Sequence, residues 1–364
     1  MTAVQTDVSP YDALLLVSFG GPEAPEQVMP YLERVTAGRG VPPERLAEVA
    51  EHYLHFGGRS PINDQNRAFL AAMADDLVGR GIDLPIYWGN RNSEPFLADT
   101  LARMRDDGVT RAAAFVTSAY SSYSGCRQYR ENLADAVAAV QDAPRLDKLR
   151  HYFDHPGFVE ANADALRAAW DQLPPDGRAG ARVAFVTHSI PTAMQDSSGP
   201  AGGAYAAQHR AAAGAIVGRL AEQGVVLGSW DLVFCSRSGS PQVPWLEPDV
   251  NDWLRAQADA GVPAVVLAPI GFVSDHMEVV FDLDTEAAET AEEIGLTMVR
   301  AGTAGVHPAF VATVGDLLVE RGAVERGEGA PRPALSDLGP SHDVCPAGCC
   351  PNLRVDRPAL CGRD

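Results

Sequence analysis

Short runs of apolar residues recur along the whole chain and alternate with longer segments in which apolar residues return every three or four positions. The short runs are continuous and rich in aliphatic side chains, which is typical of parallel strands covered on both faces. The longer segments have the period of amphipathic helices. This alternation predicts an α/β fold of parallel sheets flanked by helices. We expect strands at 13–19, 84–88, 112–118, 182–188, 231–235, 264–270 and 296–301, and helices that include 65–80, 128–140, 156–172, 208–223 and 285–293.

The segment PPDGRAG at 174–180 is the clearest boundary. Its Pro and Gly residues favour a linker, and a new apolar run follows it. We therefore expect two βαβ-type halves, at 10–173 and 181–322. After residue 322 the sequence becomes polar and rich in Pro and Gly, so 323–364 is expected to be a tail that delivers a cysteine-rich end.

Charge and hydropathy exclude several partners. The chain carries 48 acidic and 29 basic residues, a net charge of −19 at pH 7. Nucleic acid and anionic membranes both attract Lys- and Arg-rich surfaces, so we expect neither as a partner. No segment has the roughly 18 apolar residues of a membrane helix, and no signal peptide is visible, so we expect a cytoplasmic protein without membrane insertion.

Four of the six cysteines lie after residue 344, at Cys345, Cys349, Cys350 and Cys361. In a reducing compartment such clustering favours a metal or iron–sulfur site over a disulfide framework. Cys235 lies inside an expected strand and is interpreted as a small buried apolar residue.

His188 stands at the end of the expected strand 182–188, before a Pro-containing turn. Ligands of parallel α/β folds bind beyond the carboxyl ends of strands. A neutral imidazole there can bind a divalent metal or accept a proton near pH 7. A purely structural histidine is the alternative reading.

The segment GFVSDHMEVVFDLDTE at 271–286 also follows a strand. If it becomes helical near residue 276, Glu278, Asp282 and Glu286 share one helical stripe. Such a stripe is either a solvated face or a carboxylate ladder for a divalent cation. Asp275 is a candidate to orient the His276 imidazole.

Three loops of the first half follow strands in the same way: FGGP at 19–22, GNRNSEPF at 89–96 and TSAYSSYSGCRQY at 117–129. Their hydroxyls and Arg side chains suit carboxylate or phosphate groups, although a Ser-rich capping loop is the alternative for the third. The Gly-Gly pair permits close backbone approach to a ligand but lacks the dinucleotide pattern GxGxxG.

Together these segments resemble the ferrochelatase family. The resemblance rests on seven segments in order: LLLVSFGGPE (14–23), GGRSPIN (57–63), YWGNRNSEPF (87–96), SAYSSYSGCRQY (118–129), THSIPTAM (187–194), SRSGSPQVPWLEP (236–248) and GFVSDHMEVVFDLDTE (271–286). The acidic character and the cysteine tail resemble the actinobacterial branch, which metallates coproporphyrin III to coproheme. The resemblance implies two Rossmann-like domains with a porphyrin cleft between them.

The resemblance also implies roles for the second-half residues. His188 and Glu278 face the porphyrin centre and share iron delivery and pyrrole deprotonation, in an order that the sequence leaves open. Asp282 and Glu286 match an outer acidic path for Fe²⁺, and Asp275 and His276 match a supporting pair.

Other family positions line the cleft or hold propionates. They correspond here to Phe19, Arg59, Ser60, Arg91, Asn92, Ser122, Tyr123, Tyr129 and Trp245. Phe19 stands where some relatives have a tyrosine that ligates the product iron, and a phenyl ring cannot do so.

Some ferrochelatases carry a 2Fe-2S cluster held by one cysteine of the first domain and three of the C-terminus. Such a cluster needs four thiolates. The resemblance implies Cys126, Cys345, Cys349 and Cys350, with Cys361 as a substitute because adjacent ligands are sterically awkward. A zinc site and an unliganded tail are the alternatives.

The expected function is a ferrochelatase of haem biosynthesis that inserts Fe²⁺ into coproporphyrin III. The reaction must remove two pyrrole protons, strip water from Fe²⁺ and bend the ring, which calls for a near-neutral base, loosely binding carboxylates and preferential binding of the distorted porphyrin. The alternatives are a protoporphyrin IX ferrochelatase, a cobalt or nickel chelatase, and a non-catalytic tetrapyrrole or iron carrier. Contact with other haem-pathway enzymes is left open.

Overall fold

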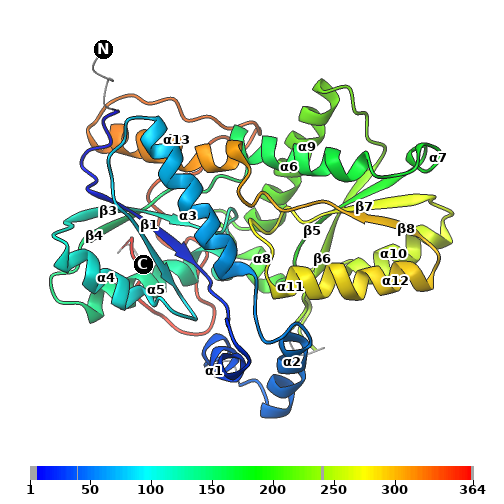
Figure 1. Ribbon diagram of the computed structural model, residues 1–364, viewed down its shortest axis with the longest axis horizontal. Coiled ribbons are helices and arrows are strands. Elements are labelled where there is room, and N and C mark those ends of the chain that lie inside the picture. Colours follow the sequence, from blue (N-terminus) through cyan, green and yellow to red (C-terminus); the bar gives the residue numbers. More distant parts are fainter. Residues whose placement is uncertain (1–5, 39, 239–241, 362–364) are drawn as a thin grey trace.

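A computed structural model describes residues 6–38, 40–238 and 242–361 of the chain (Figure 1). It contains two four-stranded parallel sheets, with strand orders β2-β1-β3-β4 and β6-β5-β7-β8. Each sheet lies in its own lobe, and helices surround both (Figure 1). The predicted α/β fold with parallel sheets is confirmed.

The first lobe is built around β1, whose six residues are all buried. Alternate residues of this strand enter different cores: Leu14 and Leu16 pack into one, and Leu15 and Val17 into another. Both faces of the sheet are therefore covered, which explains why the run is continuously apolar. The elements of this lobe are β1 (Ala13–Ser18), α1 (Pro25–Val35), α2 (Pro43–His55), α3 (Ile62–Gly79), β2 (Ile86–Asn90), α4 (Leu97–Asp106), β3 (Arg111–Val116), η1 (Tyr123–Arg127), α5 (Gln128–Ala139) and β4 (Arg145–Lys148).

The strand β4 was not predicted from the sequence. Its four residues, Arg-Leu-Asp-Lys, are mostly charged, and it lies at the edge of the sheet, where only one neighbouring strand is needed. An edge strand has no requirement for an apolar run, so the hydrophobic pattern carries no signal for it.

The second lobe repeats the arrangement around β5, where Val183 and Phe185 face one core and Ala184 and Val186 another. Its elements are α6 (Pro156–Trp170), α7 (Pro175–Arg178), β5 (Arg182–His188), α8 (Thr192–Asp196), α9 (Ala204–Glu222), β6 (Trp230–Cys235), α10 (Val250–Asp259), β7 (Ala264–Ala268), α11 (Met277–Phe281), η2 (Asp282–Glu286), α12 (Ala287–Glu293) and β8 (Thr297–Arg300). The last helix, α13 (Pro308–Glu325), returns to the first lobe and lies beside α3 (Figure 1).

The helices α6 and α13 join the two lobes. Phe310 of α13 stacks on Phe69 of α3 at 5.2 Å and contacts Phe158 of α6 at 5.6 Å between ring centroids. One hydrophobic core therefore runs from β1 to β5. We keep the division into 10–173, 181–322 and 323–364 as a proposal, because α6 and α13 pack against residues of both lobes.

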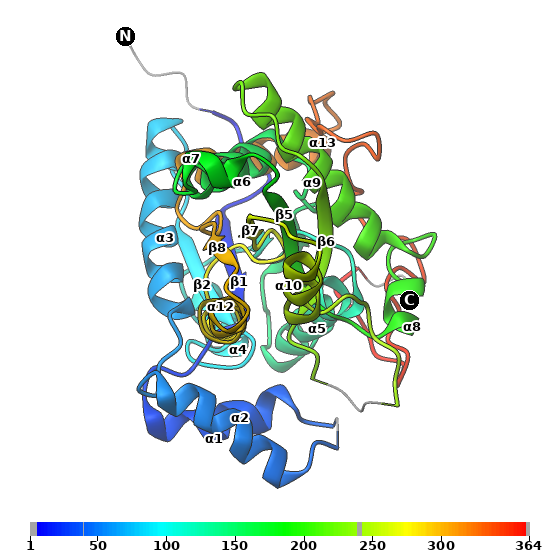
Figure 2. The same cartoon turned by 90° about the vertical axis from the view of Figure 1, so that its right-hand side faces the viewer.

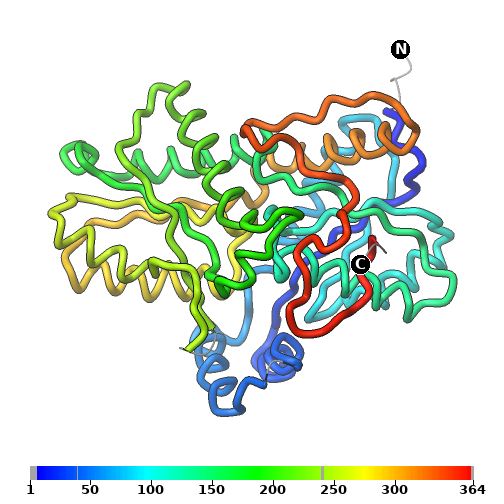
Figure 3. Tube along the Cα trace, turned by 180° about the vertical axis from the view of Figure 1, so that it is seen from behind, coloured from blue at the N-terminus to red at the C-terminus, as the bar shows by residue number. Residues whose placement is uncertain are grey.

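From residue 327 to residue 361 the chain forms no helix or strand and runs along the back of the first lobe (Figure 3). Backbone and side chains hold it there: the Leu335 N–H donates to the Asp154 carbonyl at 2.9 Å, and Arg332 pairs with Glu320 at 3.1 Å. The tail is thus packed against the fold.

The helices α1 and α2 project together from the rest of the chain (Figure 2). Across the described part of the chain, no helix has both the length and the apolarity needed to cross a membrane.

Candidate active site

The first polar residue after the buried part of β5 is His188, with a side chain that is 32% exposed. The segment after β7 crosses the end of β5 at Gly271, where an added Cβ would lie 2.1 Å from the Thr187 hydroxyl oxygen. Only glycine permits this close approach. As a result, Nε2 of His188 lies 3.7 Å from Oε1 of Glu278.

The orientation of the His188 ring is fixed by its neighbours. Nδ1 lies 2.5 Å from the carbonyl oxygen of Ser189, which can only accept, so Nδ1 carries the hydrogen and Nε2 presents its lone pair. The Tyr205 hydroxyl donates to the His188 carbonyl at 2.8 Å. The side chain is therefore held with its basic nitrogen toward Glu278.

Opposing effects set the pKa of His188. Burial lowers it, but the Glu278 carboxylate, the Ser189 carbonyl and Asp282 more than offset this effect, so the pKa lies above the ordinary histidine value. A carboxylate next to an imidazole stabilises the protonated form. His188 is consequently a stronger base than a free histidine.

The carboxylates of the segment 277–286 lie close together, with one departure from the predicted stripe. The helix α11 begins at Met277 as expected, but residues Asp282–Glu286 form a π turn, which changes the rotation between Asp282 and Glu286. Asp282 still interacts with both Glu278 and Glu286. The three acidic groups therefore remain neighbours.

Asp282 is unusual among these carboxylates because its pKa is raised to about 7. Burial is the main cause; the Ser236 hydroxyl, which donates to the carboxylate, opposes it, and the charges of Glu278 and Glu286 add to it. Burial and the charge of Asp249 also raise the pKa of Glu286. A carboxylate held partly neutral near pH 7, as Asp282 is, can accept a cation and release a proton as it does so.

Asp275 and His276 have separate partners. Nδ1 of His276 accepts from the Glu278 N–H at 3.2 Å and caps α11. Asp275 lies 3.1 Å from Nη1 of Arg300, and its N–H donates to the Gln65 side chain of α3 at 2.9 Å. His276 thus fixes the helix that carries Glu278, while Asp275 links this segment to Arg300 and to the first lobe.

In the first lobe, Arg91 lies over the rings of Phe19, at 5.2 Å, and Tyr129, at 4.3 Å. Phe19 also contacts Tyr31 edge-on at 6.4 Å. Burial raises the pKa of Tyr31, and the charges of Tyr53 and Glu278 add to this effect. Tyr31 of the first lobe, which contacts Phe19, is therefore close enough to Glu278 of the second lobe to be affected by its charge.

The turn after β1 depends on glycine. Gly20 has φ +77°, and an added Cβ there would lie 2.4 Å from the Ser93 hydroxyl oxygen; at Gly21 it would lie 2.7 Å from Ser60. The buried Asn92 holds the same turn, because its side-chain amide donates to the Phe19 carbonyl at 3.1 Å. Ser60 and Asn92 thus shape the site through the backbone.

The remaining predicted porphyrin residues divide by position. Arg59 is half exposed and paired with Asp64 at 2.5 Å. Ser122 is buried and accepts from the Gly125 N–H, while the Tyr123 hydroxyl accepts from Asn352 of the tail at 3.0 Å. The stretch 244–246, which contains Trp245, pairs with 190–192 beside His188. Residues 239–241 of the predicted segment 236–248 lie outside the described residues.

The cysteines of the tail gather around Cys126 of η1. Cys126, Cys345, Cys349 and Cys350 are all buried together, with Cys361 packed against them. Cys350 accepts from the Gly199 N–H at 3.0 Å, and Arg130 of α5 donates to the Cys349 carbonyl at 3.1 Å. Cys235 is buried in β6, away from this group.

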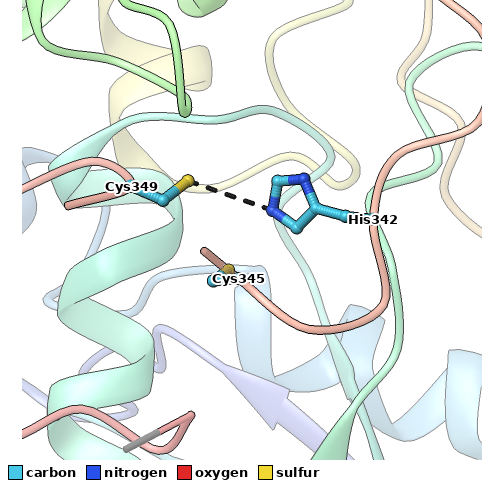
Figure 4. Close-up of side chains that lie close together, drawn as sticks. All are labelled: His342, Cys345 and Cys349. Atoms are coloured by element: carbon cyan, nitrogen blue, oxygen red, sulfur yellow. Dashed lines mark hydrogen bonds between the residues drawn. The ribbon is translucent and has the colours of Figure 1, made fainter. Parts of the chain in front are cut away.

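His342 joins this cysteine site and was missed in the sequence. Its Nε2 lies 3.9 Å from Sγ of Cys349, and the ligand atoms of His342, Cys345 and Cys349 all lie within 4.8 Å of one another (Figure 4). Three such atoms can hold one metal ion. The His-x₂-Cys spacing of 342–345 was the available signal.

A cavity of about 820 Å³ lies between α6, α9 and residues 335–338. None of the predicted site residues lines it, so it belongs to a different face of the molecule.

A family model described as "Ferrochelatase" matches residues 11–322. The "Coproporphyrin III ferrochelatase" of Streptomyces griseus is 57% identical over 98% of both chains, and the "Ferrochelatase" of Rhodopirellula baltica is 50% identical over 95% of both. Among solved structures, SirB from Bacillus subtilis with Fe³⁺ aligns with a TM-score of 0.51, at 13% identity, over 86% of this chain and 97% of that one. That likeness concerns the fold alone.

Proposed function

The chain belongs to the ferrochelatase family, and from that premise we propose that it inserts Fe²⁺ into coproporphyrin III to give coproheme, a step of haem biosynthesis. It is an enzyme with a porphyrin and Fe²⁺ as substrates. The observation that carries the proposal is the contact between His188 and Glu278, at 3.7 Å, next to the carboxylates of Asp282 and Glu286. A base and a set of oxygen ligands are thereby placed side by side, as metal insertion into a protonated ring requires.

In our proposal His188 takes the pyrrole protons. Its Nε2 carries the lone pair, and Glu278 raises its pKa, so proton uptake is favoured where the imidazolium is stabilised. A positioned base of near-neutral pKa typically contributes 10²–10⁴-fold to a rate. The two pyrrole protons pass to Nε2 one after the other as their N–H bonds break, and each ring nitrogen keeps the electron pair that binds the metal. Nε2 holds one proton at a time, so the partly exposed imidazole releases the first to solvent before it takes the second.

The carboxylates of Glu278, Asp282 and Glu286 hold the incoming Fe²⁺ in the same proposal. Carboxylates bind hard divalent cations through oxygen. Because burial and mutual repulsion raise the pKa of Asp282 to about 7, cation binding there displaces a proton and is weak enough for release. Fe²⁺ then exchanges carboxylate oxygen for ring nitrogen.

Coproporphyrin III is the proposed porphyrin for two reasons. Its four propionates require cations and hydroxyls, and Arg91 and Arg59 belong to the segments that we expect to bind them. Among the large apolar residues of α1 and α2, only Met29 and Leu54 are exposed in the described part of the chain. With so few large apolar side chains exposed, these two helices offer little surface to collect a membrane-borne porphyrin. Protoporphyrin IX is the alternative.

The residues present fit a 2Fe-2S cluster. Four buried thiols, those of Cys126, Cys345, Cys349 and Cys350, lie together, and four thiolates are what the cluster needs. We propose these four as ligands, with Cys361 able to replace Cys349 or Cys350. The cluster would supply a link between the tail and the first lobe and a redox centre; the insertion steps above use only the chain's own side chains.

We further propose that the protein works in the cytoplasm and meets other haem-pathway enzymes only transiently. Reduced thiols at Cys126 and in the tail suit that compartment, and the product must pass to a following enzyme. Cell fractionation and cross-linking in cells test both statements.

The decisive assay mixes the purified protein with coproporphyrin III and Fe²⁺ without oxygen and follows the coproheme spectrum. Catalytic formation of coproheme supports the proposal. Stoichiometric porphyrin binding without turnover would instead make the protein a tetrapyrrole carrier.

A further inference from the structure

Arg300 contacts the segment that carries Glu278 on both sides of that residue. It ends β8, and its guanidinium makes two parallel contacts with Asp284, Nε to Oδ1 at 2.7 Å and Nη2 to Oδ2 at 2.6 Å. The remaining nitrogen, Nη1, lies 3.1 Å from Oδ1 of Asp275. The side chain is only 18% exposed. One cation therefore joins the segment before Glu278 to the π turn after it.

The segment that Arg300 holds needs such a partner. Residues 275–293 contain eight acidic residues, at 275, 278, 282, 284, 286, 289, 292 and 293, and no Lys or Arg. Like charges on one helix repel. In addition, α11 has only five residues before the π turn interrupts it, and so short a helix has little stability of its own.

The strand that carries Arg300 is itself fixed to the strand that carries His188. Arg300 pairs in register with Leu267 of β7, and β7 pairs with β5. A continuous path of backbone pairing thus leads from His188 to the guanidinium, and ion pairs lead from there to both ends of the α11 segment. Side chains on such a frame keep their geometry better than side chains on an isolated loop.

Two acidic residues of the π turn, Asp282 and Asp284, have different partners. Asp284 turns to Arg300, whereas Asp282, two residues earlier, accepts from the Ser236 hydroxyl and interacts with Glu278. Pairing with Arg300 takes up the charges of Asp275 and Asp284, the acidic neighbours of Glu278 and Asp282 that face β8. Asp275 and Asp284 are thereby turned to the guanidinium, while Glu278 and Asp282 stay on the side of His188.

We propose that Arg300 is a positioning residue for metal insertion, which holds Glu278 and Asp282 in register with His188 by pairing with Asp275 and Asp284. This inference rests on the proposed ferrochelatase function. The guanidinium acts through these carboxylates and touches neither substrate. A displacement of about 1 Å at reacting groups can cost about 100-fold in rate.

The test compares Arg300→Met, Arg300→Lys and Asp284→Asn with the wild type, and uses Arg105→Met as a control for loss of a surface arginine paired with Asp106. We expect Arg300→Met to lower kcat for coproheme formation at least tenfold while the KM for coproporphyrin III changes less than twofold. Arg300→Lys keeps the charge without the two parallel contacts and should be intermediate. Arg105→Met should match the wild type.

The double variant Arg300→Met, Asp284→Asn makes the test specific to the ion pair. Because both changes break the same contact, the double variant should have a kcat within about threefold of Arg300→Met alone. If the wild type makes no coproheme, the proposed function fails. If the wild type is active and folded Arg300→Met, or Asp284→Asn where Arg300→Met does not fold, keeps kcat within twofold, the positioning role of Arg300 is wrong.

Discussion

The basic nitrogen of His188 lies 3.7 Å from the Glu278 carboxylate, although His188 ends β5 and Glu278 lies in α11, after β7. Two local features produce this contact. Gly271 lets its segment cross the end of β5, and the Ser189 carbonyl holds the ring so that Nε2 faces Glu278.

Replacing His188 tests the base directly. His188→Asn removes the imidazole but leaves a polar side chain, and we expect coproheme formation to fall by about 10²–10⁴-fold, the usual contribution of a general base. Porphyrin binding, measured by fluorescence quenching, should remain, since the predicted porphyrin contacts lie elsewhere. His307→Asn is the matched control, with a histidine of 31% exposure that caps α13. Activity of His188→Asn near that of the control would remove His188 from the mechanism.

Glu278 should control the basicity of His188. The carboxylate raises the pKa of the imidazole because it stabilises the positive form, so Glu278→Gln must lower that pKa. A titration of His188 by NMR, in wild type and variant, measures the change. An unchanged pKa would mean that the contact seen between the two side chains has no electrostatic effect.

The raised pKa of Asp282 predicts a pH-dependent stability. Its folded pKa of about 7 lies above the unfolded value of 3.8, so the folded protein binds more protons between these values and loses stability as the pH rises through this range. Asp282→Asn removes the loss. The Tm of the variant, relative to wild type, should therefore increase more at pH 8 than at pH 4.

Asp282 should also determine how the rate of metal insertion depends on pH. Wild-type metal insertion should rise as the pH passes through about 7, since Asp282 must lose its proton to bind Fe²⁺. In Asp282→Asn the rise should move to lower pH, because removal of a neighbouring negative charge lowers the pKa of His188. Identical profiles for the two proteins would show that Asp282 does not take part in this pH range.

The cysteine site makes a prediction that is independent of activity. Anaerobically purified protein should contain two iron and two sulfide per chain and absorb in the visible range, as four-thiolate clusters do. Cys345→Ser should lose this absorption, and Cys235→Ser, a buried cysteine of β6, should keep it. Bound zinc in place of iron, or a colourless protein with intact thiols, would contradict the cluster.

The pattern of apolar residues was sufficient for most of the fold. All seven predicted strands are present, and β5 has the predicted limits, because strands covered on both faces must be apolar throughout. The charged edge strand β4 and the π turn at 282–286 gave no such signal. Both depend on tertiary neighbours: β4 on pairing with β3, and the turn on Arg300 and Ser236.

The candidate site shows the same division. Glu278 and His188 could be proposed as neighbours because both follow strands of one sheet. The pairing of Asp275 with Arg300 could not be predicted in this way. The neighbour of Asp275 in the sequence is His276, whereas Arg300 lies in β8, which follows α12. Likewise, the Tyr123 hydroxyl contacts the tail through Asn352, a contact between segments far apart in the chain.

The central claim is best tested by the choice of porphyrin. Purified protein is given Fe²⁺ and either coproporphyrin III or protoporphyrin IX, without oxygen, and kcat/KM is measured for each by the appearance of the metallated ring. We predict a kcat/KM at least tenfold higher for coproporphyrin III, a difference of about 1.4 kcal/mol in transition-state binding. A preference for protoporphyrin IX, or no turnover of either porphyrin, would contradict the account.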